Sequence, residues 1–401
     1  MANTEAATLS PPAATAGPAA GGLLITLSST TSEHLSTILS RLALAFAGQS
    51  VMVVSPDIPG PDESFGPGIT LLPPGDVGLP AGSWLLTPAE LLGAFRQMST
   101  HGAAACLILG QEAHTLDPAA LRALADSVLF GGADLGVPDY HLGPREGLFN
   151  SALLYPLSRA LYNAQPRFPL ALDLACSRRF ADRLTAGAQK SSTIADGIFW
   201  PVAEAAVAGL RIEQVPGGPR LLPSPVTSDL NTLLAQIAGS LFADIEVKAA
   251  FWQRSRPNQP ALTDTDLADE TDEPADVQSL IEDFRVANTN LHEIWSLVIP
   301  PQSLLGLKKL SLLDAPAFRM PAALWARMVY DFVLAFRLRT LNRGHLLGAL
   351  TPLYLAWVAS HLLVIDSGIP PEQHIEETAS AFESEKPYFV SRWRWPDRFN
   401  P

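Results

Sequence analysis

The chain has 401 residues, of which 47% are hydrophobic and 17% are charged, and its formal net charge at pH 7 is -13. This length supports a sizeable core and two or three domains, and the composition is that of a globular protein. The negative charge excludes nucleic acid as a main partner, because phosphate binding needs clustered Lys and Arg. Cys106 and Cys176 both stand among apolar residues. We therefore expect buried free thiols and a reducing, cytoplasmic setting.

Two segments bear on targeting and membranes. Residues 1–22 are rich in Ala, Pro and Thr and lack both a basic start and an apolar core, which predicts a disordered tail and no signal peptide. Leu346–Ile365 is apolar enough to be compared with a membrane-spanning helix. Its neighbours have the amphipathic pattern of one helical bundle, so we expect a buried core helix and no membrane span.

Apolar runs of strand length alternate with amphipathic segments in the N-terminal half. Strands are expected at residues 23–27, 51–54, 69–72 and 104–109, and helices at 32–46 and 87–98. Strand, helix and strand at this spacing form a right-handed crossover unit of a parallel sheet. A doubly wound α/β domain binds ligands at the carboxyl ends of its strands. The turns Ser28–Thr31, Ser55–Asp57 and Gly110–His114 meet that description.

An ordered series of motifs runs from Ala104 to Arg220. After the strand at 104–109 come a polar turn, a helix at 119–129, an apolar piece at 133–137, a polar loop at 138–147, a helix that begins near residue 148, and apolar runs at 168–177 and 209–216. This order resembles the catalytic half of GT-A-fold glycosyltransferases, particularly the branch with mannosylglycerate and glucosylglycerate synthases. The resemblance covers about half of the chain. It implies the fold class α/β, with a GT-A-like, doubly wound, mostly parallel sheet followed by a C-terminal helical bundle.

The C-terminal part has the apolar spacing of helices in a bundle. Helices are expected at 230–252, 277–298, 301–313, 321–341, 346–365 and 371–382. An acidic run at 263–276 without apolar periodicity predicts a solvated linker. We divide the chain into a tail (1–22), a GT-A-like nucleotide-sugar-binding domain (23–255), an acidic linker (256–276) and a helical domain (277–401). The alternating cations and indoles of 392–395 stay open between ring stacking, a partner surface and a strand-like cover.

The resemblance implies a divalent cation, Mg²⁺ or Mn²⁺, at the turn after the strand at 104–109. In metal-dependent relatives, two acids flank one residue there and hold the ion that bridges the nucleotide diphosphate. The matching residues are Gly110-Gln111-Glu112, of which Glu112 keeps the acid. A single carboxylate can still help to hold a hydrated ion when substrate phosphates complete its shell. The other interpretation of Glu112 is a solvated turn residue.

Two acids are expected to be catalytic on the same resemblance. The family motif Pro-x-Gly-Gly-acid corresponds to Pro169–Asp173, in which Asp173 keeps the acid. An unpaired buried carboxylate is expensive, so Asp173 needs either a sugar hydroxyl or a structural partner. Glu146, which Gly147 follows, preserves the acid-glycine character of the family loop that precedes its acceptor-side helix.

The remaining candidates are expected to bind substrate, and each has a plainer alternative. Ser28 lies in the turn after the first strand, and Asp57 would contact the nucleoside after the second strand or would be an ordinary turn residue. Arg220 would pair with a diphosphate in place of the ion, or would be a surface residue. The loop residues that would line an acceptor pocket, or form plain surface, are Tyr140, His141 and Arg145.

Two functions therefore remain open. The first is transfer of a hexose from a nucleotide-activated sugar donor to a small-molecule or glycan acceptor. The sequence also leaves open whether the chain forms a homo-oligomer. The second is a non-catalytic descendant that acts as a binding or scaffolding subunit. It is favoured by four departures from the family motifs: the first metal acid, a His, the Gly-Gly pair and a further acid. Those positions hold Gly110, Leu222, Ala171-Leu172 and Phe199.

Overall fold

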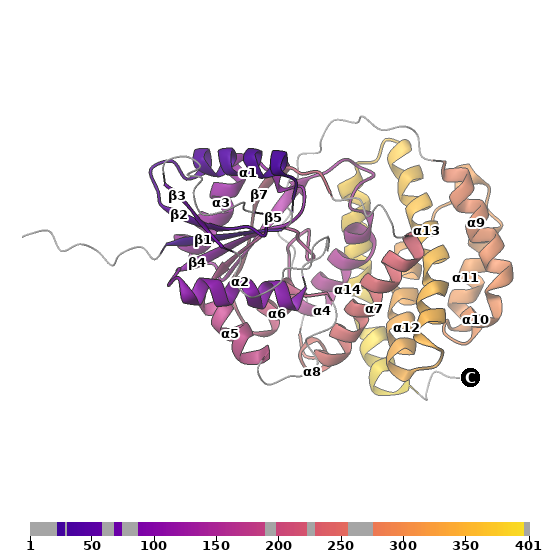
Figure 1. The fold of residues 1–401 in the computed structure, drawn as a ribbon. Coiled ribbons are helices and arrows are strands. Elements are labelled where there is room, and N and C mark those ends of the chain that lie inside the picture. Colours follow the sequence, from indigo (N-terminus) through magenta and orange to yellow (C-terminus); the bar gives the residue numbers. More distant parts are fainter. Residues whose placement is uncertain are drawn as a thin grey trace, which may run out of the picture.

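The structure is a computed structural model that describes residues 22–28, 30–57, 68–73, 87–188, 198–222, 229–255 and 276–396. The predicted tail and acidic linker therefore lie, apart from Gly22 and Asp276, outside the described residues. The described chain has an α/β part built on one sheet and a helical part beside it (Figure 1).

One seven-stranded sheet forms the α/β part, in the order β3-β2-β1-β4-β6-β5-β7. All neighbouring strands are parallel except β6, which runs antiparallel to both β4 and β5. The strands are β1 (Leu23–Leu27), β2 (Val51–Val54), β3 (Ile69–Leu72), β4 (Ala105–Leu109), β5 (Leu135–His141), β6 (Leu174–Ser177) and β7 (Ile212–Pro219). The predicted fold class, α/β with a mostly parallel sheet followed by a helical bundle, is confirmed.

Helices cover both faces of the sheet (Figure 1). On one face lie α1 (Ser32–Ala45) and α3 (Pro118–Leu129), and on the other lie α2 (Pro88–Thr100), α5 (Arg178–Ala188) and α6 (Pro201–Val207). Two short elements complete this part: the 3₁₀ turn η1 (Ala113–Thr115) after β4 and the π-helical turn η2 (Asn150–Leu154) that leads into α4 (Tyr155–Tyr162). The polar loop expected at 138–147 is wrong in its first residues, because β5 continues to His141 through its pairing with β7.

The helical part is a bundle of packed helices. Its elements are α7 (Leu230–Val247), α8 (Ala249–Trp252), α9 (Val277–Asn290), α10 (His292–Ser296), α11 (Pro301–Ser311), η3 (Ala315–Ala317), α12 (Ala322–Leu338), α13 (Arg343–Asp366) and α14 (Pro371–Arg394). The helix expected at 277–298 is two helices, which meet at Leu291. The predicted end of the last helix is also wrong, because α14 continues through Pro387. Residues 392–394 are therefore helical rather than strand-like, and Trp395 caps the helix.

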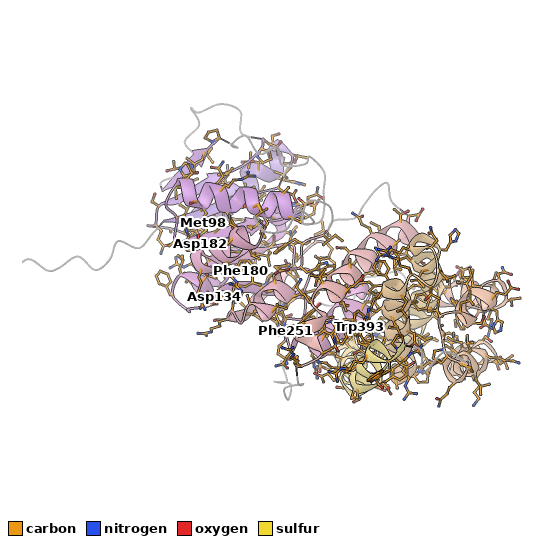
Figure 2. The ribbon with its side chains drawn as sticks, turned by 90° about the horizontal axis from the view of Figure 1, so that it is seen from below. Met98, Asp134, Phe180, Asp182, Phe251 and Trp393 are labelled. Carbon is orange, nitrogen blue, oxygen red and sulfur yellow. The ribbon has the colours of Figure 1, made fainter. Side chains whose placement is uncertain are left out.

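A single hydrophobic core joins the two parts. Leu24 of the sheet, Leu157 of α4, Trp252 of α8 and Phe284 of α9 belong to one buried cluster, and a smaller cluster fills the space under α1 and α3. Figure 2 shows Phe251 and Trp393 at the junction, whereas Met98 and Phe180 lie in the α/β part. Helix α13 is long and apolar enough to cross a membrane, and 72% of its most apolar stretch is buried inside the protein.

Candidate functional site

The carboxylate of Asp173 forms a buried cluster at the carboxyl end of β4. Its Oδ2 accepts hydrogen bonds from the Tyr140 hydroxyl at 2.8 Å and from Arg220 Nε at 2.9 Å. Its Oδ1 accepts from the Gly110 N–H at 3.0 Å and from a second Arg220 nitrogen at 3.3 Å. The side chains of Asp173 and Arg220 are both 0% exposed. The carboxylate that sequence reasoning left without a partner therefore has four donors around it.

Arg220 connects this cluster to the turn after β4. Besides Asp173, its guanidinium donates to the carbonyl of Gln111 and, at 3.1 Å, to the carbonyl of Leu221. Burial disfavours the charged guanidinium, but Asp173 and Tyr140 together raise the pKa of Arg220 above its ordinary value. Burial, and then Asp173, raise the pKa of the Tyr140 hydroxyl well above its usual range, so it remains a donor. The expected surface position of Arg220 is wrong, because an ion pair buries it.

The backbone around Gly110 is close-packed, which explains why this position holds a glycine. A Cβ added to Gly110 would meet the carbonyl oxygen of Leu172 at 2.8 Å, a distance that real Cβ contacts do not show. The side chain of Leu172 is itself 7% exposed. This end of β4 is therefore filled by protein atoms.

Glu112 lies in a second group, with two histidines. Its Oε2 is 3.5 Å from Nδ1 of His114, and the ring of His34 stacks on that of His114 at 3.7 Å between centroids and 18° between planes. One ligand atom from each of the three residues lies within 4.8 Å of the others. Burial, and then His34, lower the pKa of His114, which favours the neutral imidazole. Two nitrogens and one carboxylate suit a divalent transition metal better than Mg²⁺, which prefers oxygen ligands.

Sequence reasoning missed both histidines. His34 opens α1 and His114 lies in η1, so 80 positions separate them along the chain, and only the pairing of β1 with β4 brings them together. The available signal was local: His114 follows Glu112 by two residues in a turn at a strand's carboxyl end. That pattern alone does not reveal the third member.

The other candidates do not converge on Asp173. Ser28 donates its backbone N–H to the carbonyl of Leu109 at 3.0 Å, within the strand ends. Asp57 accepts from the N–H of Thr30 at 2.7 Å and so ties the turns after β1 and β2 together. His141 is half-buried and ends β5. Arg145 and Glu146 lie in the loop that follows β5 and make other contacts.

Arg145 and Glu146 serve the loop in which they lie. A nitrogen of Arg145 is 3.6 Å from a carboxylate oxygen of Asp366, at the end of α13. The exposed Glu146 accepts from the N–H of Gly143 at 3.0 Å and so closes its own turn. These contacts attach the loop to the bundle and to itself. Tyr140 is thus the one candidate of this segment that reaches Asp173.

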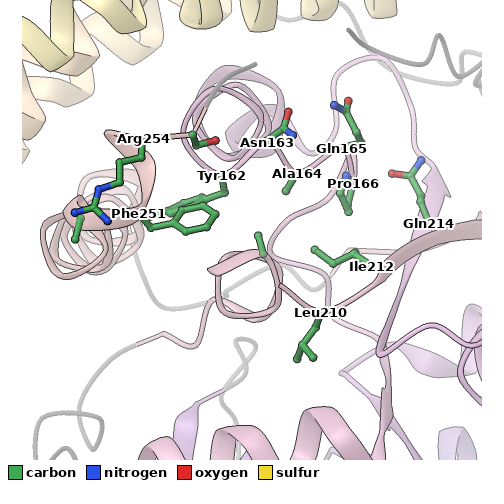
Figure 3. A pocket seen from close by; sticks show the side chains of 13 residues that line it. Tyr162, Asn163, Ala164, Gln165, Pro166, Leu210, Ile212, Gln214, Phe251 and Arg254 are labelled. Carbon is green, nitrogen blue, oxygen red and sulfur yellow. The ribbon is translucent and has the colours of Figure 1, made fainter. Parts of the chain in front are cut away.

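A cleft of about 690 Å³ opens beside the edge strand β7, between the end of α4, α6 and α8 (Figure 3). Its lining residues are Tyr162, Asn163, Ala164, Gln165, Pro166, Ala206, Leu210, Ile212, Gln214, Ala250, Phe251, Arg254 and Ser255. Gln214 is already engaged, since its side chain accepts from the Arg167 N–H at 2.6 Å and donates to Asp139 at 2.8 Å. The lining thus combines aromatic faces with amide and guanidinium groups.

The sequence matches no protein-family model and no curated protein. Among solved structures, glucosyl-3-phosphoglycerate synthase from Mycobacterium tuberculosis, in complex with Mn²⁺, UDP and glucosyl-3-phosphoglycerate, is 15% identical. It covers 56% of this chain and 79% of the synthase chain with a TM-score of 0.35. The same synthase with phosphoglyceric acid (14% identity, 56% and 79% covered) and a mycobacterial protein (14%, 56% and 74%) both give a TM-score of 0.36. A likeness at this level does not define the chemistry of this chain.

Proposed function

We propose that this chain is a GT-A-like protein that binds a glycan or small molecule without transferring sugar. The observation that carries the proposal is the buried ion pair between Asp173 and Arg220. Sugar transfer depends on charge that is positioned at the donor phosphates and on carboxylates that reach the sugar. Here the carboxylate is fully buried, and four protein donors already surround it.

The cleft beside β7 supports the binding role. Its volume lies within the range of about 300–1,000 Å³ that is typical of small-molecule sites. The Phe251 ring offers an apolar surface, and the Gln165 amide carries both donors and acceptors, which suits a ligand with many hydroxyl groups. Because the cleft lies away from the buried ion pair, binding there needs none of the donor chemistry.

One observation favours a second function, transfer of a hexose from a nucleotide-activated sugar to a small-molecule or glycan acceptor. Glu112 and two imidazoles stand together at the carboxyl end of β4. Ligands of doubly wound α/β proteins bind at such ends. A divalent cation at that point would provide a place for a diphosphate beside the buried ion pair.

Calorimetric titration separates the two functions. The full chain is titrated with a panel of nucleoside diphosphate sugars, with and without Mg²⁺ or Mn²⁺, and donor hydrolysis is followed in parallel. We expect neither saturable donor binding nor turnover. Metal-dependent binding with turnover, both lost in Glu112→Gln, would instead establish the transferase.

A second titration tests the cleft with a panel of oligosaccharides. We expect binding that Phe251→Ala and Gln165→Ala each weaken. The matched control is Phe130→Ala, which removes a ring that is 67% exposed at the end of α3. Failure of all oligosaccharides to bind, or binding that Phe251→Ala leaves unchanged, would remove the cleft from the proposal.

A further inference from the structure

Three side chains that the proposed binding function does not use meet at the carboxyl ends of β1 and β4. His34 lies in the first turn of α1, which follows β1, and Glu112 and His114 lie in the turn that follows β4. One nitrogen or oxygen from each lies within 4.8 Å of the others, and all three residues are half-buried. Segments far apart in the sequence thus supply the donor atoms of one small site.

One buried polar atom of this group has no hydrogen-bond partner in the protein. Nδ1 of His114 is shielded from solvent and has no hydrogen-bond partner, and the nearest carboxylate oxygen, from Glu112, is 3.5 Å away. A buried imidazole nitrogen is normally hydrogen-bonded, so an orphaned one needs an explanation. A metal ion bound by this nitrogen and by the Glu112 carboxylate would supply the partner that the nitrogen lacks.

The backbone holds Glu112 in an unusual conformation. Its φ of 61° and ψ of 14° lie in the left-handed region, which a residue with a Cβ rarely adopts. The Thr115 N–H and hydroxyl both donate to the Glu112 carbonyl, at 3.0 and 2.8 Å, and fix the turn. Such backbone conformations concentrate at functional sites. Here the conformation keeps the carboxylate beside the two rings.

We propose that His34, Glu112 and His114 form a binding site for one divalent transition metal ion of the Zn²⁺ class. Two imidazole nitrogens and one carboxylate oxygen are a ligand set that Zn²⁺ uses when its fourth position is left for water or a ligand. Mg²⁺ and Ca²⁺ bind oxygen and gain little from imidazole. Because the rings are now stacked, both must rotate about their side-chain torsions to direct one nitrogen each at the ion.

This site shares Glu112 with the cation position that the family resemblance implies, but its other ligands are different. They are His34 from α1 and His114 from η1, in place of a second acid. The residue after β7, Arg220, is instead bonded to the carbonyl of Gln111 and to Asp173. The metal site therefore does not depend on whether the chain binds or transfers sugar.

The test uses the full chain after it has been stripped with EDTA. Zn²⁺ is titrated calorimetrically in the presence of excess Mg²⁺, and Co²⁺ is added in a parallel experiment to record its visible absorption. We expect one Zn²⁺ per chain and a Co²⁺ spectrum of low coordination number. His34→Ala and His114→Ala should each weaken Zn²⁺ binding at least about tenfold, the smallest loss typical of disturbing such a site.

Controls keep the outcome decisive. His101→Ala removes an exposed histidine at the end of α2 and should bind Zn²⁺ like the wild type. If an alanine variant folds poorly, His34→Gln replaces it, and the rise in Tm on adding Zn²⁺ to the EDTA-stripped protein is compared instead, since an ion that binds only the folded state stabilises it. The proposal is overturned if Zn²⁺ does not saturate one site, if excess Mg²⁺ displaces it, or if binding survives in both ligand variants.

Discussion

Replacing Arg220 with methionine should destabilise the protein more than almost any surface change. The variant Arg220→Met keeps the length of the side chain but leaves the 0% exposed Asp173 carboxylate without its two guanidinium bonds, at 2.9 and 3.3 Å. Removing one partner of a buried ion pair typically costs about 3–5 kcal/mol. For a chain of this size, that loss lowers the Tm by on the order of 4–6 °C.

A double-mutant cycle shows whether this loss belongs to the pair. Asp173→Asn should be similarly destabilising, but the double variant should lose no more than either single variant, because no unpaired charge stays buried. The loss in Arg220→Met should also shrink as the pH falls, since the orphaned carboxyl can then take a proton. Tm values from circular dichroism at pH 7 and pH 5 measure both effects.

An ion pair whose arginine is exposed provides the control for this cycle. Arg179 is 72% exposed and lies 3.4 Å from Asp134, which Figure 2 shows in the α/β part. Surface pairs contribute at most about 1 kcal/mol, so Arg179→Met should barely change the Tm. If Arg220→Met behaved like Arg179→Met, or if the two losses in the buried pair simply added, the reasoning about the buried centre would be refuted.

Two other buried groups give predictions about pH and thiol chemistry. His361 and His374 share a 2.8 Å contact between their Nδ1 atoms, and burial lowers their pKa values to about 3 and about 4. Because the unfolded chain then binds more protons below pH 6.5, stability should fall between pH 6.5 and 4 by up to about 1.4 kcal/mol per pH unit for each His. When Tm is measured as a function of pH, the double variant with leucine at both positions should show a smaller fall in Tm than the wild type. An equal fall would exclude the two histidines as the cause of the pH dependence. Cys106 and Cys176 lie opposite each other on β4 and β6. Burial raises the pKa of Cys106 to about 12 and that of Cys176 well above its usual value, so a thiol reagent should label neither in the native protein and both after denaturation.

The sequence predicts the elements of the sheet well, because their signals are local. The apolar runs at β1, β2, β3 and β4 and the Thr87 cap of α2 are visible in short windows, and the structure has them within a residue or two. The helices of the bundle are predictable for the same reason, because their apolar spacing is also a local signal. Their ends are less predictable, as α14 shows: tertiary contacts outweigh the proline inside it, since Phe389 and Trp393 pack on Trp252.

The site depends on contacts that no local pattern contains. The rule that a buried carboxylate needs a partner predicts that Asp173 has one, but the partner, Arg220, lies 47 residues further along. The same holds for His34, which meets His114 only because α1 begins where β1 ends, beside β4. Residue type can thus indicate that a partner is needed, whereas strand order decides which residue it is.

On our proposal that the chain binds a ligand without transferring sugar, the charges at the end of β4 account for the missing transfer. A cation in a donor site is useful when its charge remains available to the substrate phosphates. In this chain the positive charge of Arg220 is covalently fixed, buried and neutralised by Asp173, with Tyr140 completing the hydrogen bonds. A diphosphate would therefore have to break that pair before it gained anything from the guanidinium. Leaving the buried Asp173 carboxylate without its partner would cost about 3–5 kcal/mol. Arg220 and Asp173, which the resemblance assigns to the substrate and to catalysis, are paired with each other inside the protein, whereas the ion site that we propose uses the neighbouring imidazoles.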